Sequence, residues 1–372
     1  MPALLADVRR FMEVVSPRHA KPPQEISVAP AAGLGGLAHV YLETVSACDL
    51  DCRFCPRVTH KRLRSSALLS DDILARLMPE LIRMQRVSLN GLGEPLLDRR
   101  MPALVRTLSR AGVVTGLTTN GTLLPAGGVE LMEEGISLIA LSLDGATEGT
   151  QAQLRDGTSV EALFARFALL VEARARLKAA TQLAVTTVLS RENVSELPAL
   201  VTRVARIGGD ALLVKNLTFT ANPGSAASSF IAEDAGVAGE GGGAAIDEAL
   251  ARAKALGIAL TINRNRRHRL GSPPWHCPYH PLTSVFVSVE GLVFPCFVEG
   301  ERWMGNGGHM PSPNAIGDLR QASLTEIWSH PPASAFRAAF AAGTNPACRD
   351  CMLIGEEYRQ STPPPMRAVH QA

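Results

Sequence analysis

The feature that most constrains the fold is a repeated alternation of short apolar runs with longer amphipathic segments. Short runs rich in β-branched and aliphatic residues predict strands, and helical spacing of apolar residues between them predicts helices. Six strand–helix repeats favour a parallel sheet that curls into an open barrel, because parallel strands need a crossover between them. The predicted strands are residues 39–44, 86–89, 113–118, 136–143, 183–189 and 211–217.

Changes in composition divide the chain into four predicted parts. A stretch rich in Pro, Ala and Gly precedes the first strand. A run of Arg followed by Pro at 264–275 marks a boundary after the repeats. We predict an N-terminal extension (1–35), the barrel (36–263), a small cysteine-rich α+β domain (264–360) and a tail (361–372).

Composition excludes several classes of protein. The chain has 372 residues, 46% of them hydrophobic and 19% charged, as in ordinary globular proteins. A net charge of +2 gives no electrostatic reason to expect nucleic acid as a partner. No apolar run approaches the length of a membrane span, and no signal-peptide pattern is present at the N-terminus. We therefore expect a cytoplasmic protein with no membrane partner.

The seven cysteines fall into two groups. In a large chain expected inside the cell, cysteines favour metal binding or catalysis over disulfides. Thiolates are soft ligands that select zinc, copper(I) or iron–sulfur clusters. With His60 as a fourth ligand the first group could hold zinc, whereas three cysteines alone could hold a four-iron cluster with one open iron. The first group is Cys48, Cys52 and Cys55, and the second is Cys277, Cys296, Cys348 and Cys351.

The first group resembles the cluster loop of the radical SAM superfamily. The segment runs Cys48-Asp49-Leu50-Asp51-Cys52-Arg53-Phe54-Cys55 and follows the first predicted strand, as in that family. The ends of later strands resemble segments that line the S-adenosylmethionine (SAM) site of the family. These are Gly91-Leu92-Gly93-Glu94-Pro95, Thr118-Thr119-Asn120-Gly121, Ser142-Leu143-Asp144-Gly145 and Ser190-Arg191-Glu192-Asn193.

The resemblance assigns candidate cofactor contacts to residues on one rim of the barrel. Each also has a simpler interpretation: the glycines suit a tight turn, and Asp144 suits a turn after a strand. Their joint order at successive strand ends favours the functional interpretation. The candidate SAM contacts are Phe54, Gly91, Gly93, Glu94, Asn120, Ser142, Asp144, Ser190 and Arg191.

The second group lies within segments that resemble the SPASM/twitch extensions of radical SAM enzymes. Strands at 284–289 and 292–294 flank Glu290-Gly291 and predict a hairpin before Cys296. Ile316-Gly317-Asp318-Leu319 and the run from Ser323 to Trp328 complete the likeness. The resemblance implies an auxiliary [4Fe-4S] cluster with all four cysteines as ligands, although a zinc site stays open on spacing alone. The predicted fold is thus a partial (β/α)6 TIM-like barrel followed by a twitch/SPASM-like domain.

The resemblance implies an enzyme that cleaves SAM reductively and abstracts hydrogen from a substrate. An external donor such as flavodoxin or ferredoxin would supply the electron. We expect a small metabolite, such as a sugar or nucleotide-linked compound, that is oxidised or rearranged. A peptide- or protein-modifying maturase is the alternative within the family, and a zinc-binding or electron-transfer protein is the alternative outside it. The basic run from Arg264 to Arg269 could contact an anionic substrate or form a solvated linker, and no general base can be assigned among His276, Tyr279, His280 and Glu299.

Overall fold

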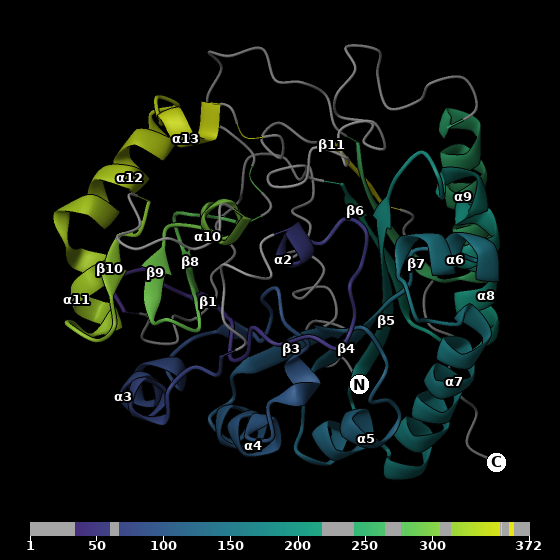
Figure 1. Cartoon of the computed structure of the whole chain (residues 1–372), viewed down its shortest axis with the longest axis horizontal. Coiled ribbons are helices and arrows are strands. Elements are labelled where there is room, and N and C mark those ends of the chain that lie inside the picture. The colour runs from purple at the N-terminus through teal and green to yellow at the C-terminus, as the bar shows by residue number, and fades with distance from the viewer. Residues whose placement is uncertain are drawn as a thin grey trace.

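The fold is built on one 11-stranded sheet that curves around a central space (Figure 1). The computed structural model describes residues 34–59, 67–217, 242–264, 277, 279–305, 314–349, 351 and 357–360. The sheet order is β10-β9-β8-β1-β2-β3-β4-β5-β6-β7-β11, and every pairing from β8–β1 to β6–β7 in this order is parallel. The α/β open barrel predicted from the sequence is therefore confirmed.

Six barrel strands, β1 to β6, match the six predicted strands to within a few residues, and β7 follows them. They are β1 (His39–Leu42), β2 (Arg86–Ser88), β3 (Val114–Thr119), β4 (Leu138–Ser142), β5 (Gln182–Leu189), β6 (Ala211–Asn216) and β7 (Ala259–Arg264).

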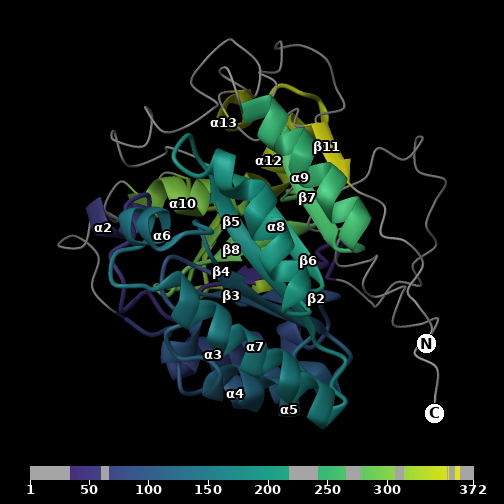
Figure 2. The ribbon, with the colours of Figure 1, turned by 90° about the vertical axis from the view of Figure 1, so that its right-hand side faces the viewer.

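Helices cover the outer face of the sheet. Figure 2 looks onto α7, α8 and α9, which lie over the strands on one side of the barrel. The helices of this part are α3 (Asp71–Leu81), α4 (Met101–Arg110), α5 (Ala126–Glu133), α6 (Glu148–Leu154), α7 (Val160–Leu177), α8 (Leu197–Arg206) and α9 (Gly242–Leu256).

The two faces of the strands bury different side chains. Alternate residues of a strand point to opposite faces, so the outward ones join the large core beneath the helices. The inward ones form a separate small cluster in which three of the five buried members are alanine. Small side chains at this level leave room inside the barrel toward the carboxyl ends of the strands. The buried members of this inner cluster are Leu138, Ala140, Ala184, Ala211 and Leu213.

The C-terminal part joins the barrel sheet rather than forming a sheet of its own. The predicted hairpin is present as β8 (Ser284–Val287) and β9 (Leu292–Phe294), and β8 pairs in parallel with β1. At the other end, β11 (Glu357–Gln360) pairs antiparallel with β7. An open barrel has two edges with unpaired backbone groups, and these strands cover both.

The remaining C-terminal elements lie beside the β8–β9 edge in Figure 1. These elements are α10 (Phe297–Gly305), β10 (Gly317–Asp318), α11 (Leu324–Ser329), α12 (Pro331–Ala341) and α13 (Pro346–Arg349).

Among the residues that the structure describes, no helix has the length and apolarity needed to cross a bilayer.

Glu80 of α3 connects the barrel to α11. Its carboxylate accepts hydrogen bonds from the backbone N–H groups of Leu324 (2.9 Å) and Thr325 (2.7 Å) and from the Thr325 hydroxyl (2.5 Å). A carboxylate at a helix N-terminus satisfies free donors there and interacts favourably with the helix dipole.

We expect Glu80→Ala to lower the free energy of unfolding by about 1 to 2 kcal/mol, as the loss of a helix cap does. Thermal unfolding and limited proteolysis near residue 324 would measure this. Glu80→Gln keeps one acceptor oxygen and should recover part of the loss. Equal stability of Glu80→Ala and the parent protein would contradict the role of Glu80 as a cap.

Candidate active site

Three thiols from one loop line a single cavity inside the barrel. Cys48, Cys52 and Cys55 follow β1 and precede the short helix α2 (Pro56–Thr59). The cavity has a volume of about 380 Å³ and opens at the carboxyl ends of the strands, as sites in parallel barrels do. Burial raises the pKa of Cys55 to about 12 and also raises the pKa values of Cys48 and Cys52. Several half-buried thiols that face one space suit a soft cationic group, which stabilises the thiolate form.

Backbone and side-chain hydrogen bonds hold the loop in place. The nearly buried Arg57 donates to the carbonyl of Leu50 (2.7 Å) and to the Asp51 carboxylate (2.8 Å). The backbone N–H of Arg53 donates to the carbonyl of Leu154 at the end of α6 (3.0 Å). Arg57 thus closes the loop on itself, and the Arg53 N–H fixes the loop to the end of α6.

The glycine segment after β2 packs directly on the strand-end region of β1. A Cβ at Gly93 would lie 2.1 Å from the carbonyl oxygen of Val45, and one at Gly91 would lie 2.2 Å from the Glu43 side chain. The buried Glu43 carboxylate accepts from the backbone of Leu92 (2.9 Å) and of Val289 (3.3 Å). The glycines therefore allow close approach of two backbones, and both glycines line the cavity.

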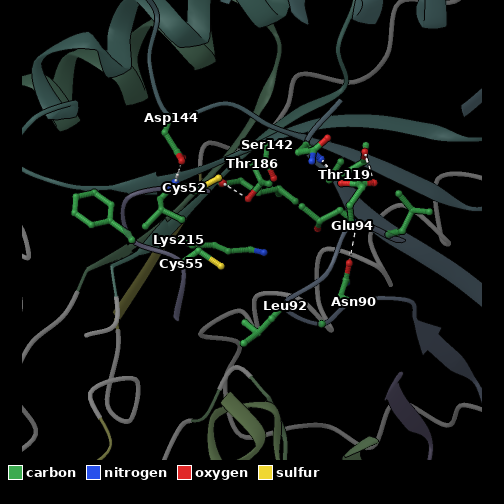
Figure 3. A pocket seen from close by; sticks show the side chains of 18 of the residues that line it. Cys52, Cys55, Asn90, Leu92, Glu94, Thr119, Ser142, Asp144, Thr186 and Lys215 are labelled. Carbon is green, nitrogen blue, oxygen red and sulfur yellow. Dashed lines mark hydrogen bonds between the residues drawn. The ribbon is translucent and has the colours of Figure 1, made fainter. Parts of the chain in front are cut away.

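Glu94 joins this segment to the end of β3. Its carboxylate is 2% exposed and accepts from the Thr119 hydroxyl (2.8 Å) and from the backbone N–H groups of Asn120 (2.7 Å) and Leu96 (3.1 Å). Burial raises the pKa of Glu94, although these donors oppose the shift. The Asn120 side chain in turn donates to Asp49 in the cysteine loop (2.7 Å). Figure 3 shows Glu94 and Thr119 side by side at the cavity.

A buried ion pair connects the end of β4 to the cysteine loop. Arg155 follows α6, and its Nε donates to Asp144 (2.6 Å) while its Nη1 lies 3.6 Å from the Sγ atom of Cys52. The other Asp144 oxygen accepts from the backbone N–H of Val188 (2.8 Å). Arg155 lines the cavity, and sequence patterns do not mark it because it lies outside the strand-end segments.

The four C-terminal cysteines come together near α10 and α13. Cys277, Cys348 and Cys351 pack around Phe340, and Cys296 packs beside Cys351. Burial and the neighbouring thiols raise the pKa values of Cys277, Cys296 and Cys348. Within the described ranges, no three His, Cys, Asp or Glu side chains are arranged to hold a single metal ion. His60, the fourth ligand in the zinc alternative, lies outside those ranges.

Two family models match the chain. The model of the radical SAM superfamily matches residues 42–203, and that of the SPASM iron–sulfur cluster-binding domain matches residues 277–352. The chain belongs to the radical SAM superfamily and carries a SPASM domain.

One curated relative of this radical SAM protein spans most of the chain. The tungsten-containing aldehyde ferredoxin oxidoreductase cofactor-modifying protein of Pyrococcus furiosus is 26% identical over 85% of this chain and 88% of its own length. A GTP 3',8-cyclase of Bradyrhizobium diazoefficiens is 35% identical, but the match covers only 29% of this chain and 33% of the cyclase.

Solved structures of radical SAM proteins share the fold. Streptococcus suis SuiB bound to S-adenosylmethionine gives a TM-score of 0.59 at 15% identity, covering 82% of this chain and 68% of SuiB. The anSMEcpe structure with bound AdoMet gives 0.52 at 15% identity, covering 84% and 86%. Likeness at this identity concerns the fold.

The cofactors of this radical SAM protein are SAM, a [4Fe-4S] cluster and an auxiliary iron–sulfur cluster. The two thiol sets fit these groups: the donors are soft, at least partly buried and gathered in two places, and the first set opens onto a cavity. The first cluster would be held by Cys48, Cys52 and Cys55. The auxiliary cluster would be held by Cys277, Cys296, Cys348 and Cys351.

The structure brings most of the predicted SAM contacts to one cavity. Seven of them line it, whereas Ser190 and Arg191 are not among its lining residues. The fully buried Ser190 donates its backbone N–H to Asn193 (2.8 Å), which supports a role in the turn after β5. The seven lining residues are Phe54, Gly91, Gly93, Glu94, Asn120, Ser142 and Asp144.

Of the remaining candidate residues, only Tyr279 is a described residue that lines the cavity. The basic run beyond Arg264 and His276 fall outside the described residues. Glu299 is buried against Arg302 (2.7 Å), so it does not face the cavity as a free base. Tyr279 lines the cavity and stacks on Phe297 with ring centroids 5.3 Å apart.

Proposed function

We propose that this radical SAM protein abstracts a hydrogen atom from a small polar metabolite and oxidises or rearranges it. When bound, SAM and the reduced cluster supply a 5'-deoxyadenosyl radical, the reactive species of this superfamily. The chain's own residues bind and orient the reactants and keep competing hydrogen donors away. The observation that carries the proposal is one cavity lined by three loop thiols, by the strand-end segments and by further polar side chains from β6, β7 and α10.

Asp144, Arg155 and Glu94 each hold one part of the site in place. Asp144 and Arg155 form a fixed pair beside Cys52, so the loop and the end of β4 keep their relative placement. Glu94 holds the glycine segment to β3, which leaves backbone groups of Gly91 to Gly93 facing the cavity. Preorganised groups of this kind need no rearrangement when reactants bind.

The size of the cavity supports a small substrate. About 380 Å³ is near the lower end for ligand pockets, and SAM has to share it with the substrate. The Pyrococcus furiosus relative is named as a cofactor-modifying protein, and modification of a small molecule agrees with that name. A peptide substrate would present only one side chain to a space of this size. For the electron we propose a flavodoxin or ferredoxin as the donor.

Anaerobic purification and reconstitution would test the proposal. We expect brown protein with about eight irons per chain, four for each cluster. Reduction with dithionite in the presence of SAM should then yield 5'-deoxyadenosine and methionine. Protein that binds zinc and no iron, or iron-loaded protein that leaves SAM intact, would reject the proposal.

A further inference from the structure

One wall of the cavity carries three polar side chains that the sequence did not single out. The predicted SAM contacts at the cavity come from the cysteine loop and from the ends of β2, β3 and β4. Lys215 of β6, Thr261 of β7 and Glu301 of α10 line another part of it. We call these three residues the polar wall.

Sheet geometry explains why Lys215 and Thr261 face inward. Leu213 belongs to the inner cluster, and Lys215 lies two residues further along the same strand, so both point to the same face. Thr261 is the direct neighbour of Leu213 in the parallel ladder. Figure 3 shows the Lys215 side chain extending into the cavity.

Helix geometry brings Glu301 to the same place. Residues four apart lie on one face of a helix, and both Phe297 and Glu301 line the cavity. α10 begins directly after Cys296, which would be a ligand of the auxiliary cluster. Glu301 therefore connects the polar wall to the C-terminal domain.

The groups of the polar wall have no partners within the described part of the chain. Lys215 and Glu301 make no hydrogen bond or ion pair there, and the Thr261 hydroxyl, buried at 3% exposure, has no hydrogen-bond partner. Their charges nevertheless influence each other. The Lys215 side chain is exposed to the cavity, yet the protein atoms around it desolvate the ammonium and lower its pKa, with Arg155 adding to the shift and Glu301 and Asp144 opposing it. Burial raises the pKa of Glu301 to about 7, while Lys215 and Arg302 oppose the shift.

Partly desolvated polar groups without partners cost free energy unless a ligand satisfies them. An ammonium group matches a carboxylate or a phosphate, and a nearby carboxyl matches a hydroxyl or an amine. A small molecule that carries an anionic group beside a hydroxyl or amine would satisfy both.

We propose that Lys215 and Glu301 bind the substrate, with Lys215 holding an anionic group and Glu301 hydrogen-bonding to a neighbouring hydroxyl or amine. The Thr261 hydroxyl donates to the same anionic group. This assignment rests on the proposed function. It gives the polar wall to the substrate because no predicted SAM contact belongs to that wall.

Trace acetylation with acetic anhydride, read by mass spectrometry, tests the proposal on the reconstituted, SAM-loaded protein. The chain has five lysines, so each modified peptide is assigned directly. The probes are glycerate, a hydroxy carboxylate, and inorganic phosphate. A bound anion should raise the pKa of Lys215 by about 1 unit, which slows its acetylation about tenfold near neutral pH. The exposed Lys178 and Lys254 serve as controls in the same sample and should not respond.

The two probes distinguish a carboxylate from a phosphate site, and protection by either one supports the proposal. Glu301→Gln should weaken protection by glycerate more than protection by phosphate, because only glycerate carries an alcohol hydroxyl on the carbon next to its anionic group. Lys254→Met, the matched variant at an exposed lysine outside the cavity, should keep SAM cleavage and the protection of Lys215 by both anions. Protection of Lys215 by SAM itself, or loss of SAM binding in Lys215→Met, would overturn the proposal. So would the absence of protection by both anions.

The two proposals fail in different ways. Loss of SAM cleavage in the parent protein would reject the proposed function. Intact SAM cleavage with a Lys215 that ignores both anions would reject only the substrate assignment.

Discussion

Cys52→Ala is expected to abolish the reductive cleavage of SAM and to remove about four irons from the reconstituted protein. Cys52 is the central thiol of the loop, lines the cavity and lies 3.6 Å from Arg155 Nη1. Its loss leaves two ligands for the first cluster and removes the sulfur beside the Asp144–Arg155 pair. Iron analysis and chromatographic detection of 5'-deoxyadenosine would measure the result.

Cys296→Ala provides the contrast for this experiment. It should also remove about four irons, but from the auxiliary site. The spectroscopic change that SAM causes in the first cluster should persist in Cys296→Ala and be absent in Cys52→Ala. Formation of 5'-deoxyadenosine by Cys52→Ala at the parental rate would contradict the assignment of the first cluster.

Gly93→Ala is expected to disrupt the site through a single methyl group. The added Cβ would lie 2.1 Å from the carbonyl oxygen of Val45 and 2.7 Å from that of Ala47, and backbone atoms cannot rotate away. Overpacking of this kind costs about 3 kcal/mol. It should also separate the glycine segment from the cysteine loop, because the Glu94 N–H donates to Ala47 (2.8 Å). Thermal unfolding and SAM titration would measure the two effects.

Gly149→Ala is the matched control because no atom lies within 4 Å of the position of its Cβ. Gly149 lies in α6, where alanine should be neutral or stabilise by about 0.5 kcal/mol. If Gly93→Ala behaved like Gly149→Ala in both measurements, the close approach at Gly93 would not matter for the site.

The barrel strands could be predicted from the sequence because buried parallel strands are apolar throughout. β4 is buried at every residue, and its run of apolar residues was recognisable at once. Helices with a weaker apolar pattern are harder to predict from the sequence. α5 contains Gly127 and Gly128, which lower helix propensity, and packing of Leu131 and Met132 holds it in place.

The pairing of the C-terminal hairpin with the barrel could not be predicted. The hairpin itself follows from Glu290-Gly291 between two apolar runs, but β8 joins β1 across more than two hundred residues of chain. Sequence patterns report local periodicity, whereas such a pairing depends on which sheet edge is free.

The candidate site likewise has a part that could be predicted from the sequence and a part that could not. The cysteines and the strand-end segments repeat spacings that a family shares, so they could be identified in order along the chain. Arg155 and Lys215 have ordinary surroundings in the sequence. Arg155 matters because it contacts Asp144 and Cys52, and Lys215 matters because it points inward from β6.

The pairing of β8 with β1 and of β11 with β7 limits how modular this enzyme is. Exchange of its C-terminal part for that of another family member would have to replace both edge strands in register. A barrel cut free before residue 284 would present two unpaired edges, which are templates for self-association. The two cysteine sets lie in regions matched by different family models, but the strands of both regions belong to one sheet.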